Sequence, residues 1–353
     1  MCCATNRPMV SIGRVSYPLY LWHWPLLAFA AIAFPGDLPA VTRAALALAA
    51  FLLAVGTWRW LESPLHGKPM PLPRRLVGAT LATSVAVALL MVQVADVAGT
   101  SPASDSNPLA GLDAPSNVPR CHNHFASPAR LPDEAACVLG GKDPPRIAIW
   151  GDSHALALGP FATAIARREG RTAIAYSRDA CPPAVGYDTG QQGLLAARCN
   201  NFNEAAIRRA ETMDTVILAA RWPLHGERDF AADLTTTVDR LSSHVRRIFV
   251  IGPTPVLPAN APYCLHHKVL HSCEVTREEF VARSAAIREL LSSLPATHPN
   301  VTYVEPLDFF CDEVMCPGAR NGVALYWDNH HIASTAAAAF GTAFLARRAD
   351  RDL

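Results

Sequence analysis

The sequence predicts an α/β protein: a three-layer α/β/α domain with a parallel sheet, preceded by a small bundle of transmembrane helices. From residue 146 onward, short apolar runs alternate with longer helical patterns, which is typical of a parallel sheet with helices on both faces. Before residue 100, three stretches are almost entirely apolar. We therefore expect three membrane spans within residues 1–100, a linker at 101–120 and a globular domain at 121–353.

The three apolar stretches are residues 17–34, 44–60 and 76–97. A helix needs about 20 mostly apolar residues to cross the hydrocarbon core, so the third is long enough and the first two are marginal. A buried core helix is an alternative for the second stretch taken alone. The tryptophans near the ends favour a membrane bundle, because Trp collects at membrane–water interfaces. They are Trp22, Trp24, Trp58 and Trp60.

Basic residues between the spans predict the orientation. The loop after the second span carries Lys68, Arg74 and Arg75, whereas the loop after the first has only Arg43. The positive-inside rule then places the N-terminus in the cytoplasm and everything after the third span across the membrane. The first stretch has no small-residue cleavage site, so a removable signal peptide fits poorly. We expect a protein of the bacterial inner membrane with a periplasmic C-terminal domain.

Cysteine usage agrees with this topology. Of the ten cysteines, Cys2 and Cys3 precede the first span and the other eight follow the third. An even number confined to the exported part suits an oxidising compartment. Proximity along the chain predicts four disulfides, although sequence alone does not determine connectivity. The pairs are Cys121 with Cys137, Cys181 with Cys199, Cys264 with Cys273, and Cys311 with Cys316.

The segment "CLHHKVLHSC", residues 264–273, offers an alternative zinc site, because three histidines lie between its two cysteines. Structural zinc sites usually bring closely spaced ligand pairs together from separate elements. We favour a disulfide-closed loop and predict no metal site. The chain has 31 basic and 30 acidic residues, so no basic patch points to a nucleic-acid partner.

Residues 101–120, before the globular domain, are rich in Pro, Ser, Asn and Asp and are predicted to form a linker. Strands are predicted within "RIAIWG", "RTAIAYS", "DTVILAARW", "RRIFVIGPTPV" and "NVTYVEPLDFF". Helices are predicted within residues 154–170, 193–213, 229–245, 276–294 and 334–349.

The first predicted strand ends in "GDSH", residues 151–154. Ligands of parallel sheets bind beyond the carboxyl ends of the strands, so Ser153 is well placed for a nucleophile. A serine needs a base, and the base needs an orienting acid. Asp328 and His331, three apart before the last helix, can face one side of a turn. The alternative is that the two motifs are only helix caps and surface polar residues. Because both motifs lie at strand–helix junctions, we favour the interpretation that they form a reaction centre.

"GDSH" together with "DNHH" (328–331) resembles the SGNH hydrolase superfamily. The resemblance implies Ser153 as nucleophile, His331 as base and Asp328 as its acid, with His330 at the wrong spacing. The adjacent Asp152 and His154 are further candidates for oxyanion or substrate contacts. The family's glycine and asparagine oxyanion blocks are missing. The third strand instead ends in "AARW", which offers Arg221 and Trp222; a structural role is an equal alternative for Arg221.

The membrane part, "GRVSYPLYLWHWPLL" and "WRWLESPLHG", resembles the end of the membrane-bound acyltransferase-3 family. Members move acyl groups across the membrane onto envelope glycans, and some carry a C-terminal periplasmic SGNH domain. Because that family has many more spans, we expect an N-terminally truncated chain and a separate polypeptide that supplies the missing spans. His23 is a membrane-site candidate, since ionisable residues at that depth are often functional. A helix-packing hydrogen bond is the alternative.

These resemblances imply an O-acyltransferase that modifies envelope polysaccharide, such as lipopolysaccharide, with acetyl groups through a Ser-His-Asp acyl-enzyme. No bound cofactor is expected, but an acyl donor such as acetyl-CoA is. The expected partners are the lipid bilayer, that donor and the polysaccharide acceptor. Two alternatives stay open: a periplasmic carbohydrate esterase that uses the same residues, and a catalytically incomplete remnant that binds envelope glycan.

Overall fold

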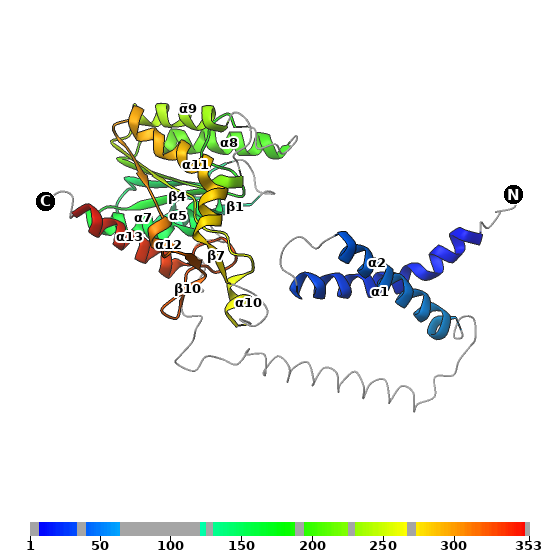
Figure 1. The fold of residues 1–353 in the computed structure, drawn as a ribbon. Helices are drawn as coiled ribbons and strands as arrows, with labels where there is room; N and C mark the ends of the chain where they lie inside the picture. Colours follow the sequence, from blue (N-terminus) through cyan, green and yellow to red (C-terminus); the bar gives the residue numbers. More distant parts are fainter. Residues whose placement is uncertain are drawn as a thin grey trace, which may run out of the picture. The chain divides into compact units, whose positions relative to one another are not determined.

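The structure, a computed structural model, describes residues 7–33, 40–63, 121–124, 130–187, 194–224, 230–266 and 273–349 (Figure 1). The chain divides into two compact units, Met1–Asp105 and Ser106–Leu353. Each unit is described by itself.

The N-terminal unit contains α1 (Arg7–Ala33) and α2 (Ala40–Gly56), which pack against each other, followed by a π-helix, η1 (Thr57–Glu62). Within the described residues, the helix Ala40–Trp60 is the one both long and apolar enough to cross a membrane. The first predicted span lies mostly in α1, which does not meet the same measure. The third predicted span, residues 76–97, lies outside the described residues.

His23 lies on α1, with its ring half-buried. Its Nδ1 lies 3.0 Å from the carbonyl oxygen of Leu19, one turn earlier in the same helix. The bond between α1 and η1 comes instead from Trp22, whose Nε1 donates to Thr57 Oγ1 at 2.9 Å. The described contacts of His23 are thus local, and a role in acyl transfer remains a prediction.

The C-terminal unit is built on a seven-stranded sheet. Its five principal strands are parallel, and each overlaps one of the five predicted runs. In spatial order they are β4 (Ala173–Arg178), β3 (Ile147–Gly151), β5 (Thr215–Ala219), β6 (Arg247–Ile251) and β8 (Val301–Val304). Two short strands border β4: β1 (His122–Asn123) runs parallel to it and β2 (Val138–Leu139) antiparallel. Neither was predicted, because two residues show no alternation of polarity.

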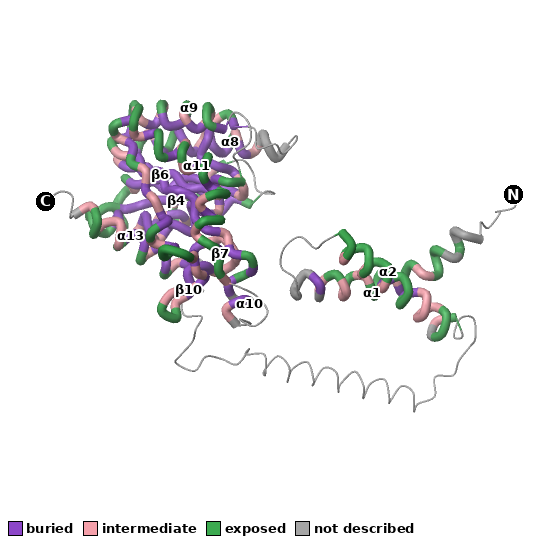
Figure 2. Tube along the Cα trace, in the orientation of Figure 1, coloured by how far each residue is buried: buried purple, intermediate pink, exposed green. Residues whose placement is uncertain are grey.

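Helices cover both faces of this sheet (Figure 1). One face carries α7 (Gly159–Glu169) and α13 (Ser334–Ala349), and the other carries α8 (Leu194–Ala210), α9 (Phe230–Ser242) and α11 (Arg277–Thr297). Every residue of β3, β4 and β5 is buried, as strands covered on both sides require. Figure 2 shows the buried residues along the strands and the exposed ones on the outer sides of the helices.

The strand order creates a switch point beside β3. From β3 the chain crosses to β4 on one side and later to β5 on the other. Right-handed crossovers in opposite directions place the connecting helices on opposite faces of the sheet. The carboxyl ends of β3 and β5 therefore leave a crevice between diverging connections, which is where doubly wound sheets bind ligands.

The helix predicted at 154–170 is broken in two. A short helix, α6 (Ser153–Ala157), ends at Leu158, and α7 starts at Gly159. Pro160 stands in the first turn of α7, where its missing backbone N–H is tolerated but a continuous helix would require one. The break gives the residues after β3 a helical turn of their own.

Shorter elements fill the remaining connections. They are α5 (Glu134–Cys137), η2 (Trp222–Leu224), α10 (Ala261–His266), α12 (Leu307–Phe310), and two small antiparallel sheets, β7 (Glu274–Thr276) with β9 (Met315–Pro317) and β10 (Ala319–Arg320) with β11 (Val323–Ala324).

The four predicted disulfides are confirmed. They close loops of 16, 18, 9 and 5 residues in chain order. The bond between Cys264 and Cys273 takes up both thiols of the segment for which zinc was the alternative. His267 and His271 of that segment lie outside the described residues.

Removal of the disulfide between Cys181 and Cys199 by a double Ser substitution should lower the unfolding free energy by about 3 kcal/mol, because its 18-residue loop restricts the unfolded chain. The matched control is the double Ser variant of Cys311 and Cys316, whose five-residue loop predicts a loss smaller by about 1 kcal/mol. Thermal unfolding of the three proteins gives the comparison. A larger loss from the shorter loop would contradict loop closure as the source of the stability.

Candidate active site

Ser153 is the first residue of α6, and Asp152 alone separates it from the end of β3. The residue at the end of the strand, Gly151, pairs with Ala219 of β5 and Ser177 of β4. A Cβ atom on Gly151 would overlap the carbonyl oxygen of Ala219. A glycine here allows β3 and β5 to remain paired up to the turn that precedes Ser153.

A Gly151→Ala substitution should therefore destabilise the fold by at least about 3 kcal/mol, because backbone rather than a mobile side chain occupies the space. Gly170→Ala is the control. Gly170 has φ of +62° but nothing within 4 Å of an added Cβ, so only about 1 kcal/mol of left-handed strain is expected. Thermal unfolding compares the two variants, and equal losses would contradict the proposed overlap.

Asp152 holds this turn in place from inside the protein. Its side chain is 1% exposed. One carboxylate oxygen accepts the His154 N–H at 2.8 Å and the other accepts the Arg221 N–H at 2.8 Å. Its carbonyl oxygen accepts the Ser177 hydroxyl at 2.9 Å. Asp152 thus caps α6 and joins the ends of three strands. This corrects the expectation that it contacts substrate or an oxyanion, since both oxygens bind the protein's own backbone.

The loop before α13 brings Asp328 and His331 to the same turn. His331 Nε2 lies 2.7 Å from Ser153 Oγ, and His331 Nδ1 lies 2.6 Å from Asp328 Oδ2. The other Asp328 oxygen accepts the N–H groups of His330 and His331 at 2.8 and 2.7 Å. Trp327 stacks on the His331 ring with centroids 5.0 Å apart. These contacts hold the imidazole with one nitrogen on the carboxylate and the other on the hydroxyl.

Asp328 stays ionised in this arrangement. Burial by itself would raise the pKa of its carboxyl group. Hydrogen bonds from the His331 ring and from the N–H groups of His330 and His331 outweigh that effect and hold the pKa well below its usual range. An anionic Asp328 keeps the proton of neutral His331 on Nδ1. The Nε2 lone pair then points at the Ser153 hydroxyl, which is the arrangement that a general base for serine requires.

A family model described as "SGNH domain (fused to AT3 domains)" matches residues 120–346. The chain belongs to this SGNH family. The resemblance stated from "GDSH" and "DNHH" is thereby confirmed, whereas the likeness of the membrane part to acyltransferase-3 proteins stays a prediction. No curated protein matches the chain.

Two solved structures are similar to this SGNH domain. The periplasmic domain of a lipopolysaccharide acetyltransferase from Salmonella ser. Paratyphi A is 20% identical, with a TM-score of 0.43, and the match covers 65% of this chain and 90% of that one. A Streptococcus pneumonia protein, provisionally described as a platelet activating factor, is 16% identical, with a TM-score of 0.34, and the match covers 58% of this chain and 84% of that one.

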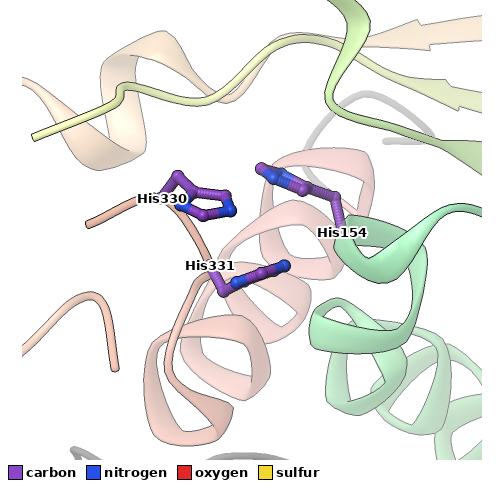
Figure 3. Close-up of side chains that lie close together, drawn as sticks. All are labelled: His154, His330 and His331. Atoms are coloured by element: carbon purple, nitrogen blue, oxygen red, sulfur yellow. The ribbon is translucent and has the colours of Figure 1, made fainter. Parts of the chain in front are cut away.

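Two more histidines of the SGNH domain lie against His331 (Figure 3). The centroid of the His154 ring is 4.9 Å from that of His331 and 5.3 Å from that of His330. Burial lowers the pKa of His154 to about 3, partly offset by Asp152, and it lowers the pKa of His330 to about 4, aided by the charge of His331. Both rings are therefore neutral at neutral pH. His330 was excluded from the site by its spacing, and only the adjacent His-His pair in the sequence hinted at it.

The two residues predicted after β5 as oxyanion or substrate contacts, Arg221 and Trp222, have different surroundings in the structure. Trp222 is wholly buried, donates Nε1–H to the Ile251 carbonyl oxygen at 2.6 Å and packs near Phe230. It is a core residue, which corrects its assignment as a substrate contact. Arg221 is half-buried, and its backbone N–H binds Asp152. Its guanidinium adds positive charge near His154 and His330.

A small cavity of about 170 Å³ lies beside His154, beyond the ends of β5 and β6. Residues of α6 and of the segments that follow β5 and β6 line it. The lining residues are His154, Ala220, Arg221, Pro223, Leu224, Thr254 and Val256. The cavity lies at the switch-point edge of the sheet and is mostly apolar apart from Arg221, His154 and Thr254, so it suits a small acyl group next to a polar centre.

Proposed function

We propose that this protein is an O-acyltransferase that moves an acetyl group from a donor to a hydroxyl of an envelope polysaccharide. Membership of the SGNH family supports an enzyme that acts on acyl groups. The observation that carries the proposal is the hydrogen-bonded chain Asp328–His331–Ser153, with distances of 2.6 and 2.7 Å. The small cavity next to His154 favours acetyl over a longer acyl group.

In the first half-reaction, Ser153 Oγ attacks the carbonyl carbon of the donor while His331 Nε2 takes the hydroxyl proton. The Ser153 N–H stabilises the resulting oxyanion. Asp328 stabilises the imidazolium that forms. When the tetrahedral intermediate collapses, His331 returns the proton to the leaving group and Ser153 holds the acyl group as an ester.

In the second half-reaction, a sugar hydroxyl attacks the acyl-enzyme ester. His331 takes the proton of that hydroxyl, and it returns a proton to Ser153 Oγ when the product ester leaves. The same steps with water as acceptor would release acetate. The difference between a transferase and an esterase therefore lies in whether the acceptor excludes water from the site.

We also propose that residues 1–100 anchor the protein in the bacterial inner membrane, with a cytoplasmic N-terminus and a periplasmic SGNH domain. The apolar helix Ala40–Trp60 and four disulfides confined to the SGNH domain support this topology. An acyl donor such as acetyl-CoA and a separate polypeptide with further membrane spans complete the proposed system.

The test supplies the purified full-length protein with a chromogenic acetyl ester, with and without an envelope oligosaccharide. A transferase should yield acetylated oligosaccharide, detected by mass spectrometry, and should consume the ester faster when the acceptor is present. Acetate release at the same rate with and without the oligosaccharide would instead identify an esterase. Absence of turnover, together with no labelling of Ser153 by a fluorophosphonate, would favour a glycan-binding remnant.

A further inference from the structure

Three imidazole rings converge next to the nucleophile. His154 comes from α6, whereas His330 and His331 come from the loop before α13. Each ring offers one nitrogen, and these three nitrogens all lie within 4.8 Å of one another. Figure 3 shows the rings of His330 and His331 both turned toward His154. The acyl-transfer mechanism uses His331 alone, so the convergence of the other two rings needs a separate explanation.

His154 makes the strongest case for a missing partner. His154 is 5% exposed, and its Nε2 atom has no hydrogen-bond partner among the described residues. Buried polar atoms almost always have a partner, and an unpaired one costs about 1–3 kcal/mol. The rings of His330 and His331 lie against it, with centroids 5.3 and 4.9 Å from that of His154. An atom that bound all three nitrogens would satisfy His154.

In the other two rings, hydrogen bonds fix which nitrogen carries the lone pair. The Nδ1 atom of His330 lies 2.6 Å from the Asn329 side-chain oxygen, and the Nδ1 atom of His331 lies 2.6 Å from Asp328. Both oxygens accept, so both Nδ1 atoms donate and each Nε2 carries the lone pair. Metal-binding histidines commonly have their second nitrogen held by an oxygen in this way, which fixes the tautomer and the ring.

We propose that His154, His330 and His331 bind a zinc ion, which competes with Ser153 for the Nε2 lone pair of His331. Neutral imidazole is a preferred ligand of zinc, and three histidines with an open fourth position form a recognised zinc geometry. Zinc–nitrogen bonds of about 2.0–2.1 Å place tetrahedral ligands about 3.4 Å apart. Small side-chain rotations would bring the nitrogens that close. The carboxylates of Asp152 and Asp328 offset part of the ion's charge.

The ion would inhibit acyl transfer reversibly. While the lone pair of His331 Nε2 binds zinc, it cannot accept the proton of Ser153, so the hydroxyl stays protonated and unreactive. The hydroxyl oxygen lies 2.7 Å from that nitrogen, so zinc and the hydroxyl would compete for the same lone pair. Inhibition rests on the proposed acyl-transfer function, whereas zinc binding does not.

The binding test uses the full chain in detergent, stripped with a chelator and titrated with Zn²⁺ by calorimetry. We expect one site. His154→Phe keeps the buried ring but removes a ligand, and it should raise the Kd at least about 100-fold, the upper end of what loss of even an outer partner costs. His330→Ala is a second variant that should also bind weakly. His244 is an exposed histidine in the turn after α9, so His244→Ala is the matched control and should bind like the wild type.

The competition test measures the rate at which a fluorophosphonate labels Ser153, each protein relative to its own metal-free rate. Zinc should slow labelling of the wild type, a chelator should restore it, and the His154→Phe variant should resist zinc. Equal zinc affinity in the wild type and the His154→Phe variant, or labelling that saturating zinc does not slow, overturns the inference. Failure of Ser153 to label without metal contradicts the proposed function instead, and calorimetry still decides whether the three histidines bind zinc.

Discussion

Replacement of Ser153 by Ala should lower kcat for acyl transfer about 10⁶-fold, the scale seen when a triad nucleophile is removed. The hydroxyl oxygen lies 2.7 Å from His331 Nε2, and no other described hydroxyl contacts that nitrogen. Without Oγ no acyl-enzyme can form, so the acetyl content of the envelope glycans should fall to background. Turnover of an acetyl ester and glycan-bound acetate are the two measurements.

Ser243→Ala is the control for this substitution. Ser243 is exposed and lies directly after α9, and its hydroxyl donates to the carbonyl oxygen of Asp239 in that helix. This variant should keep wild-type activity. If Ser153→Ala left both turnover and envelope acetylation unchanged, Ser153 would not be the nucleophile and the proposed mechanism would fail.

An Asp328→Asn substitution should lower kcat about 10⁴-fold, as expected when a triad histidine loses its acid. The amide oxygen of Asn can still accept the backbone N–H groups of His330 and His331, so the loop should keep its shape. The amide carries no negative charge to stabilise the imidazolium. It also no longer favours the proton on Nδ1, so the Nε2 lone pair is lost from part of the molecules.

Asp308→Asn provides the comparison, because Asp308 lies on the surface in an exposed ion pair with Arg277. Such pairs contribute little to stability, so activity and Tm should stay near the wild-type values. Thermal unfolding of Asp328→Asn separates chemistry from folding: we expect a folded protein with low kcat. A decrease of less than about 10-fold in a folded variant would mean that Asp328 does not orient the base.

The sequence predicted the long, regular elements of the globular domain correctly. The strands β3, β5 and β6 appear in the sequence as runs rich in Ile and Val, because strands covered on both faces are almost entirely apolar. The short strands β1 and β2 and the break at Leu158 were missed. Two-residue strands carry no periodic pattern, and the break depends on a single Gly-Pro step within an otherwise helical pattern.

The candidate site was predicted in outline and corrected in detail. Ser153, Asp328 and His331 were assigned from two motifs at strand–helix junctions, and the structure brings them within hydrogen-bond distance. Asp152 was assigned to the oxyanion or substrate because it neighbours Ser153, and Trp222 because it follows the third predicted strand, yet both residues are buried. Adjacency in sequence does not determine direction, since successive residues of a strand or turn face opposite sides.

The sequence by itself determined the alternation of strands and helices and the residue types at the strand ends, and short spacings predicted the four disulfide pairs that the structure contains. These features depend on local periodicity and on cysteines close together in the chain. Only the tertiary structure decided that Ser153 meets His331, 178 residues away, and that His154 completes a group of three imidazoles. The physical reason is the strand order: crossovers to both sides of β3 bring distant segments to one edge of the sheet, and no periodic pattern in the sequence encodes that order.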